Sequence, residues 1–236
     1  MPPEFLNPVN LAGLIAIVGA FVYAVGDVLM LAGKVDMADY PNLQAHLKLL
    51  SGVERMAGVS KRRLMWGGLL GVFAPLLVMA GYWQVYRGLS LAGANLATPP
   101  IILFVSASVV GAFVHGSFIY AGEYVQALND VSADSQSVLI GMFKRLKTIL
   151  IITYPFLFVC IIAASVWYSA VVASGRTAFP NWMAAVNPVT AFGAWLIVKK
   201  ILPSKAADAT EGAGFNIAFL IFFVLTTWTL WGKAFL

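Results

Sequence analysis

Six long apolar segments constrain the fold of this chain most strongly, because each is long enough to cross a lipid bilayer as an α-helix. A helix needs about 20 apolar residues to span the hydrocarbon core. The segments are continuous rather than alternating, which argues against the strands of a transmembrane barrel. The sequence therefore predicts an all-α fold, a polytopic transmembrane helix bundle that forms one domain over residues 1–236. The predicted spans are residues 11–32, 64–86, 99–121, 149–171, 182–198 and 214–232.

Composition excludes several classes of protein. Charged residues make up 11% of the chain, whereas a soluble domain carries about 25%. The pI near 9.4 would fit nucleic-acid binding, but the basic residues lie in short loops between apolar segments, so we expect no nucleic-acid partner. Two histidines and one cysteine are too few for a His-rich zinc site. We expect neither a metal nor a cofactor.

The distribution of basic residues predicts the orientation, since cytoplasmic loops are enriched in lysine and arginine. All but three of the 15 Lys and Arg residues fall in the first, third and fifth loops. The exceptions are Arg87, Arg176 and Lys233. This bias places both termini outside, and the lack of a glycosylation motif fits a bacterial cytoplasmic (inner) membrane.

Some segments predict departures from a plain bundle. Residues 136–147 place Leu139, Met142, Phe143 and Leu146 on one helical face, which predicts an amphipathic helix at the cytoplasmic surface of the membrane. Residues 41–58 show helical spacing of leucines and predict a second short surface helix. The segment 182–198 contains Asn187–Pro188, which predicts a kinked span.

Ionisable residues inside the spans are the main candidates for a site, because they are costly in lipid and normally face the bundle interior. Asp27 and His115 each lie about 24 Å from the outer end of their span at 1.5 Å per residue. We therefore expect one polar layer in the cytoplasmic half, formed by Asp27 and His115. Tyr154 is expected to join this layer. Arg63 is the expected third charged member, and Glu123 is placed at the mouth.

A purely structural interpretation remains open beside this one. Asp27 would then pair with Arg63 or Lys34 near the inner interface. His115 would donate a hydrogen bond to a helix carbonyl.

Three segments, "GDVLML", "RRLMWGGLLGVF" and "VVGAFVHGSF", resemble an uncharacterised family of bacterial multi-pass membrane proteins, with a domain of unknown function. The resemblance covers about residues 20–125. It rests on Gly26, Asp27, Arg63, Leu64, Gly67, Gly68, Gly71, Gly111 and His115. It implies a membrane protein but no activity.

These features leave three functions open. The first is binding or transport of a lipid or small amphiphile at the polar layer. The second is an intramembrane enzyme that uses Asp27 and His115 as an acid–base pair on a lipid-like substrate. The third is a membrane scaffold or assembly factor without chemistry. Membrane lipids are the expected partners in each case, and the sequence allows an oligomer.

Overall fold

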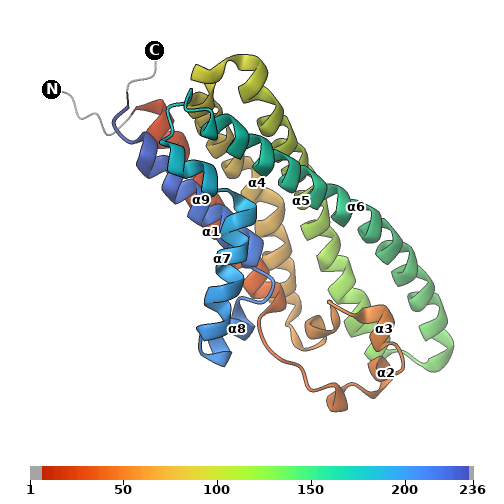
Figure 1. Ribbon diagram of the computed structural model, residues 1–236. Coiled ribbons are helices and arrows are strands. Elements are labelled where there is room, and N and C mark those ends of the chain that lie inside the picture. The colour runs from red at the N-terminus through yellow and green to blue at the C-terminus, as the bar shows by residue number, and fades with distance from the viewer. Residues whose placement is uncertain (1–6, 234–236) are drawn as a thin grey trace.

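The computed structural model describes residues 7–233, and every regular element in this range is a helix (Figure 1). The predicted domain limits at residues 1 and 236 lie outside this range. The long helices are α1 (Pro8–Leu31), α4 (Lys61–Leu89), α5 (Ala94–Asp130) and α6 (Ala133–Ala173). The shorter α-helices are α2 (Pro41–Gln44), α3 (Leu47–Leu50), α7 (Pro188–Ile201), α8 (Ser204–Ala209) and α9 (Gly214–Leu230). Short 3-10 helices occupy Met37–Asp39, Glu54–Gly58, Ser90–Ala92 and Asn181–Ala185.

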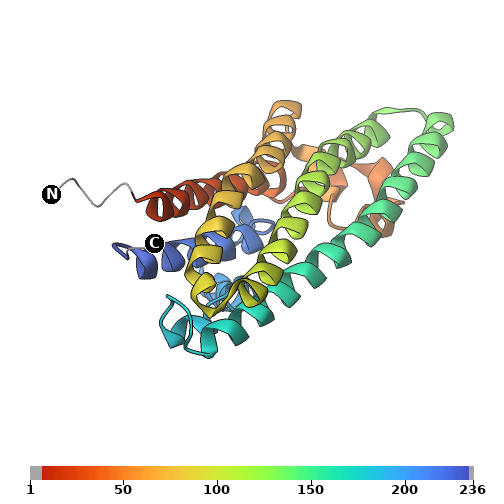
Figure 2. The ribbon, with the colours of Figure 1, turned by 90° about the horizontal axis from the view of Figure 1, so that it is seen from above.

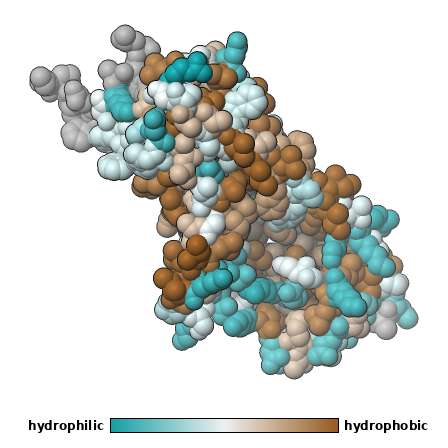
Figure 3. Space-filling view, viewed as in Figure 1, coloured by the Kyte–Doolittle hydropathy of each residue, from teal (hydrophilic) through white to brown (hydrophobic). Residues whose placement is uncertain are grey.

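Four of these helices, α1, α4, α5 and α6, are long and apolar enough to cross a membrane, and they mark the chain as a membrane protein. In the described range, α9 is a shorter apolar helix of 17 residues. Hydrophobic side chains cover the middle of the face in Figure 3, and hydrophilic ones gather at its lower end. The predicted all-α fold and its compatibility with a membrane are therefore confirmed. The predicted number of six spans is not confirmed, because four helices among residues 7–233 meet the length criterion.

The long helices pack in chain order. α1 packs along α4, α5 lies beside α4, and α6 runs along α5 (Figure 2). α9 packs on α1, and α7 packs on α9. Gly26 and Gly67 bring α1 and α4 together, since a Cβ on either would lie 2.8 Å from the carbonyl oxygen of the other. Asn7 donates a hydrogen bond to the Lys233 carbonyl at 3.0 Å. Both described ends of the chain therefore lie at the same end of the bundle.

Two hydrophobic cores divide the bundle along its length. The upper core lies nearer the chain ends and contains buried aromatic residues, among them Tyr82, Phe104, Tyr168, Phe222 and Phe223. The lower core joins α1, α4, α5 and α6 to the segment 37–59 and includes Met30, Leu43, Leu50, Met56, Val125 and Phe143. On α1 the two cores are reached by Ala20 and Met30, with Asp27 between them. The candidate polar layer thus lies at the junction of the two cores.

The sequence predicted a separate surface helix over residues 136–147, but the structure does not contain one. This segment forms the first turns of α6, which continues without a break to Ala173. Most of its apolar face packs on protein. Phe143 is buried in the lower core, with its ring 6.3 Å from that of Tyr124, and Leu139 and Leu146 are partly buried against that core, whereas Met142 is exposed. At about 1.5 Å per residue, α5 and α6 are each well over 50 Å long, longer than a ~30 Å hydrocarbon core.

The predicted fifth span is also different in the structure. Residues 182–198 are not one kinked helix, because Asn181–Ala185 form a 3-10 turn and α7 begins at Pro188. Asn187 caps this helix by accepting hydrogen bonds from the backbone of Val189 and Thr190. Proline at the first helical position lacks a donor that the helix would leave unpaired anyway. Asn187–Pro188 therefore starts a helix rather than bending one.

Candidate functional site

The structure brings Asp27 and His115 together in the interior of the bundle. Asp27 lies on α1 and His115 on α5, and Asp27 Oδ1 is 3.4 Å from His115 Nε2. Their side chains are only 6% and 10% exposed. The equal depth expected from the sequence is thus matched by direct proximity.

A third helix completes this cluster. Asn216 on α9 donates a hydrogen bond from Nδ2 to Asp27 Oδ2 at 2.6 Å. Asp27, His115 and Asn216 are called the acid–imidazole cluster below. Sequence reasoning missed Asn216 because it considered only ionisable residues. A buried amide in the apolar segment "GFNIAFLIF" was nevertheless a signal, since such groups in membrane helices usually bond across helices.

The imidazole of His115 is held in a tightly built site. A Cβ added to Gly71 on α4 would lie 2.1 Å from His115 Nδ1, so only glycine leaves room for the ring. On its other side, the ring centroid of Tyr23 is 4.5 Å away. Tyr23 lies one turn before Asp27 on α1 and was not singled out from the sequence. Nδ1 itself is buried and has no hydrogen-bond partner among the described residues.

A cavity of about 640 Å³ opens beside the acid–imidazole cluster. Its lining includes all three residues of the cluster and runs along α6 from Phe143 to Ile161. That stretch is about 27 Å long at the helical rise of 1.5 Å per residue. Most of the lining is apolar, and its polar groups are the acid–imidazole cluster, a few hydroxyls such as the bonded pair Tyr82–Ser108, and Lys147. This combination is typical of ligand sites for small molecules.

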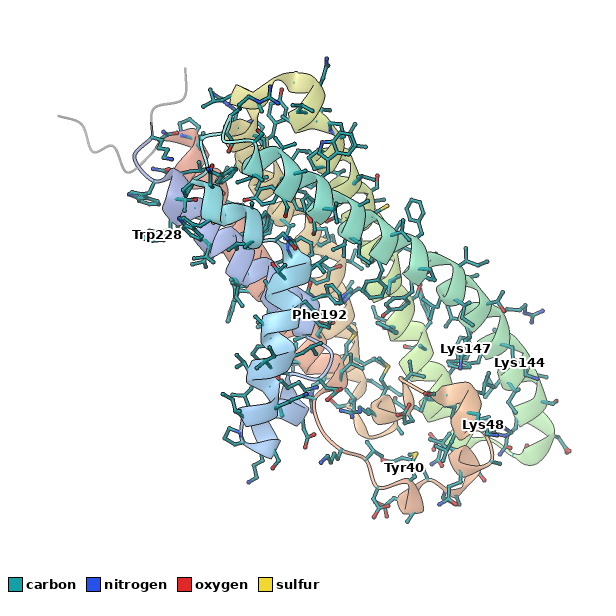
Figure 4. The ribbon with its side chains drawn as sticks, in the orientation of Figure 1. Tyr40, Lys48, Lys144, Lys147, Phe192 and Trp228 are labelled. Atoms are coloured by element: carbon teal, nitrogen blue, oxygen red, sulfur yellow. The ribbon has the colours of Figure 1, made fainter. Side chains whose placement is uncertain are left out.

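Lys147 lies at the lower end of the cavity. Its Nζ donates hydrogen bonds to the carbonyl oxygens of Leu49 at 2.7 Å and Lys48 at 3.2 Å. Figure 4 shows Lys147 on the lower part of α6, next to the segment that carries Lys48. Ser51 and Gly52 also line the cavity here. The lower mouth is therefore formed by α6 and residues 49–53, which Lys147 ties together.

The cavity separates α6 from α9. The two helices meet through Phe158 and Phe215, whose ring centroids are 5.0 Å apart. α9 begins at Gly214, so this contact lies at its lower end, and below it α6 borders the cavity without a facing part of α9 (Figure 1). Tyr154 lines the cavity in this region, where its ring centroid is 6.1 Å from that of Phe118. Tyr154 thus lies near the predicted layer without bonding to Asp27 or His115.

Two predicted members lie outside the site. Arg63 is exposed in the first turn of α4, where its backbone N–H bonds to Ser60 Oγ, and it does not line the cavity. Long basic side chains at helix ends tend to extend toward water. Glu123 is exposed and does not line the cavity either. It follows His115 by eight residues, which rotates it about 80° around the α5 axis.

The structural alternative drawn from the sequence also fails in its detail. Lys34 pairs with Asp208 at 3.0 Å, so it is not the partner of Asp27. His115 contacts the Asp27 carboxylate instead of a helix carbonyl. Within residues 7–233, no three His, Cys, Asp or Glu side chains gather as a metal site would require.

A second buried polar cluster lies nearer the chain ends. Gln84 on α4 bonds through Nε2 to Thr227 Oγ1 at 3.2 Å, and its Oε1 accepts from Thr227 at 3.3 Å and from Thr226 at 3.5 Å. These three residues are called the amide–hydroxyl cluster below. None of them lines the cavity of the acid–imidazole cluster. A Cβ on Gly13 would lie 2.2 Å from Gln84 Nε2, so α1 packs directly against this cluster.

The acid–imidazole cluster has the chemistry of a polar recognition site in an apolar wall. The carboxylate can accept hydrogen bonds or balance a cation, and the imidazole can take up or release a proton. Both groups line a cavity large enough for a small molecule. Such groups at membrane depth commonly mark ligand or proton pathways.

Comparison with known proteins places the chain in a family without revealing an activity. No curated protein and no solved structure is significantly similar to it. The uncharacterised family suggested by residues 20–125 is confirmed, and the similarity extends to residues 7–233. This wider range includes Asn216 on α9, so it covers all three residues of the acid–imidazole cluster. The chain belongs to the Family of unknown function (DUF6796), whose profile matches residues 7–233.

Proposed function

We propose that this protein binds a lipid or another small amphiphile in the cavity beside Asp27 and His115, and that it holds or transports this molecule in the membrane. The observation that carries the proposal is a mostly apolar cavity of about 640 Å³ with the acid–imidazole cluster in its wall. A polar end at the cluster and an apolar tail along α6 would match this lining. A scaffold without chemistry has no need of such a cavity.

The route into the cavity supports the same proposal. Below the Phe158–Phe215 contact, α6 has no facing part of α9, and Ile151 on this stretch lines the cavity while 62% of it is exposed. An amphiphile dissolved in the bilayer would enter along this stretch of α6 without crossing bulk water. The aromatic side chains along this route are compatible with an acyl or alkyl chain.

The proposed topology has six crossings in one domain, with both termini on the extracytoplasmic side of a bacterial cytoplasmic membrane. Two facts support it. The described ends of the chain are hydrogen-bonded to each other, as an even number of crossings allows. The basic residues of the loops gather toward the opposite end. In this arrangement the lower ends of α5 and α6, together with α2 and α3, lie at the cytoplasmic surface.

Reporter fusions test the topology. Fusions at residue 1 and at residue 236 should both report an extracytoplasmic location. A cytoplasmic signal from both would overturn the orientation, and opposite signals would exclude an even number of crossings.

A cavity-filling variant tests ligand binding. Leu157 lines the cavity, whereas Val159 on the same helix is 64% exposed and does not. We expect protein extracted in native-lipid nanodiscs to carry a bound amphiphile that native mass spectrometry detects. Leu157→Trp should lose it, and Val159→Trp should keep it. Equal retention in the two variants, or no bound amphiphile in the wild type, would contradict the proposal.

An intramembrane enzyme is the second candidate, and the 3.4 Å contact between Asp27 and His115 favours it. Such a pair could serve as a general base toward a bound lipid-like substrate. The two functions are separated by His115→Ala. Loss of turnover of the bound amphiphile with binding retained would select the enzyme. No turnover in the wild type would leave binding or transport.

A further inference from the structure

The charges that line the cavity are unevenly distributed. Among the described lining residues, Asp27 is the one carboxylate and Lys147 is the one lysine or arginine. Lys147 precedes Tyr154 by seven residues, which places it about 10 Å lower along α6. Its ammonium group already donates to two backbone carbonyls at the mouth. The inner part of the described lining therefore contains a carboxylate without a lysine or arginine beside it.

The immediate partners of Asp27 do not compensate its charge. The amide of Asn216 donates a hydrogen bond but is uncharged. The imidazole of His115 is charged only when it is protonated. When Asp27 is ionised, a neutral imidazole and an amide orient the carboxylate while leaving its negative charge facing an apolar cavity. An isolated charge in such surroundings is costly, and a counter-charge there is correspondingly favourable.

Aromatic rings line the cavity around this carboxylate. They belong to Tyr23, Phe118, Tyr154, Phe158 and Phe215. The faces of aromatic rings carry a negative electrostatic potential and attract cations within about 6 Å. The walls therefore act in the same direction as the carboxylate. Both favour a positively charged group and disfavour a negatively charged one.

We infer that the cavity selects amphiphiles with an ammonium or similar organic cation at their polar end over those with a carboxylate or phosphate. This inference rests on the amphiphile binding proposed above and specifies its chemical class. The cation lies at Asp27, and the apolar tail extends along the aromatic wall of α6. An anionic end at the same level would bring two negative charges together in a medium of low dielectric constant.

Three probes of equal chain length test the inference. Octylamine, octanol and octanoate are titrated below their critical micelle concentrations into wild-type protein in zwitterionic nanodiscs. Calorimetry measures the affinities, with empty nanodiscs as background. We expect octylamine to bind at least tenfold more tightly than octanoate, with octanol between them. Octanoate binding as tightly as octylamine overturns the charge selectivity but leaves amphiphile binding in place. Failure of all three probes to bind contradicts the proposed function itself.

A carboxylate variant locates the selectivity. In Asp27→Asn, the ratio of octylamine to octanoate affinity should fall to about one, while octanol affinity is retained. Glu123→Gln is the matched control, because it removes an exposed carboxylate that does not line the cavity. It should keep the wild-type ratio. A wild-type ratio in Asp27→Asn would overturn the assignment, and if that variant does not fold, the ratio in the wild type still decides.

Discussion

The two buried polar clusters share α9 but join it to different helices. Asn216 and Thr227 lie on one face of α9, eleven residues and about 16 Å apart at 1.5 Å per residue. Asn216 bonds to α1 at the acid–imidazole cluster, and Thr227 bonds to α4 at the amide–hydroxyl cluster. Both bonds hold α9 in the bundle. The clusters differ in the chemistry of the partner that α9 meets.

The amide–hydroxyl cluster is uncharged, and its side chains bond to one another and, from Thr226, to the Phe223 carbonyl. Gln84 and Thr226 are fully buried, and Thr227 is 3% exposed. Neutral polar groups that bond across helices hold membrane bundles together at little cost. The acid–imidazole cluster instead contains two ionisable groups, one unpartnered buried nitrogen and a cavity at its side. This difference is why we propose that the upper cluster supports the fold and that the lower one serves a ligand.

Crowding either cluster should produce the largest effect. Gly71→Ala places a methyl group 2.1 Å from His115 Nδ1, and Gly13→Ala places one 2.2 Å from Gln84 Nε2. Overpacking of this kind costs about 1–3 kcal/mol. We expect both variants to lose about 2 kcal/mol of unfolding free energy in reversible SDS–bicelle titrations. Only Gly71→Ala should also lower octylamine affinity, by at least tenfold, because only it displaces His115.

Two results for the glycine variants would contradict these expectations. Equal loss of octylamine affinity in both variants, measured where both are folded, would mean that the clusters are not functionally distinct. Unchanged stability of Gly71→Ala would mean that the imidazole is less tightly held than the packing indicates.

Replacing a polar side chain in each cluster should change the free energy of unfolding by a smaller amount, and it should destabilise the protein only at the amide–hydroxyl cluster. Gln84→Leu loses the bonds to Thr226 and Thr227, and hydrogen bonds in membrane bundles contribute about 0.6 kcal/mol on average. We expect it to lower the unfolding free energy by about 1 kcal/mol. Asp27→Asn removes a buried charge while keeping the shape of the side chain. Its stability should equal or exceed that of the wild type, as is common when a site kept for function is neutralised.

The same bicelle titrations measure both changes. If Asp27→Asn loses more stability than Gln84→Leu, the carboxylate is part of what holds the bundle together. The acid–imidazole cluster would then be a structural ion pair, and its role in ligand binding would need other support.

Hydrophobicity and depth were enough to find the centre of the site from the sequence. The cost of an ionisable group in lipid singled out Asp27 and His115, and counting inward along two parallel segments placed them at one level. The uncharged members escaped because a single Asn or Gln in an apolar segment carries no charge. Asn216 was visible in the sequence, but its partner on α1 depends on which helices pack together. That information comes only from tertiary structure.

Other departures have local causes, and some could have been avoided. The 80° rotation between His115 and Glu123 follows from helical geometry alone. Asn followed by Pro is as much a signal for the start of a helix as for a kink. The segment 136–147 is different, because an amphipathic face does not reveal whether lipid or protein covers it. Here the lower core covers Phe143 fully and Leu139 and Leu146 in part.

The smallest expected effect concerns the mouth of the cavity, and it separates local from global stability. Lys147→Met keeps a long apolar side chain but removes the donors to the carbonyls of Lys48 and Leu49. These carbonyls belong to a partly exposed segment, so water can replace the lost donors. We expect a loss of under about 0.5 kcal/mol in global unfolding, below the usual range for a hydrogen bond. Residues 47–53 should nevertheless open more often.

Hydrogen–deuterium exchange measures this opening directly. Amides of residues 47–53 should exchange several-fold faster in Lys147→Met, with no change in α1 or α4, because local opening needs only the broken tether. Octylamine should bind and dissociate faster with little change in affinity, since Asp27 is untouched. Lys144→Met is the matched control, as Lys144 is exposed on the same helix and does not line the cavity. Faster exchange around the amide–hydroxyl cluster as well would contradict the prediction, because it would show that opening of the mouth is coupled to the upper part of the bundle.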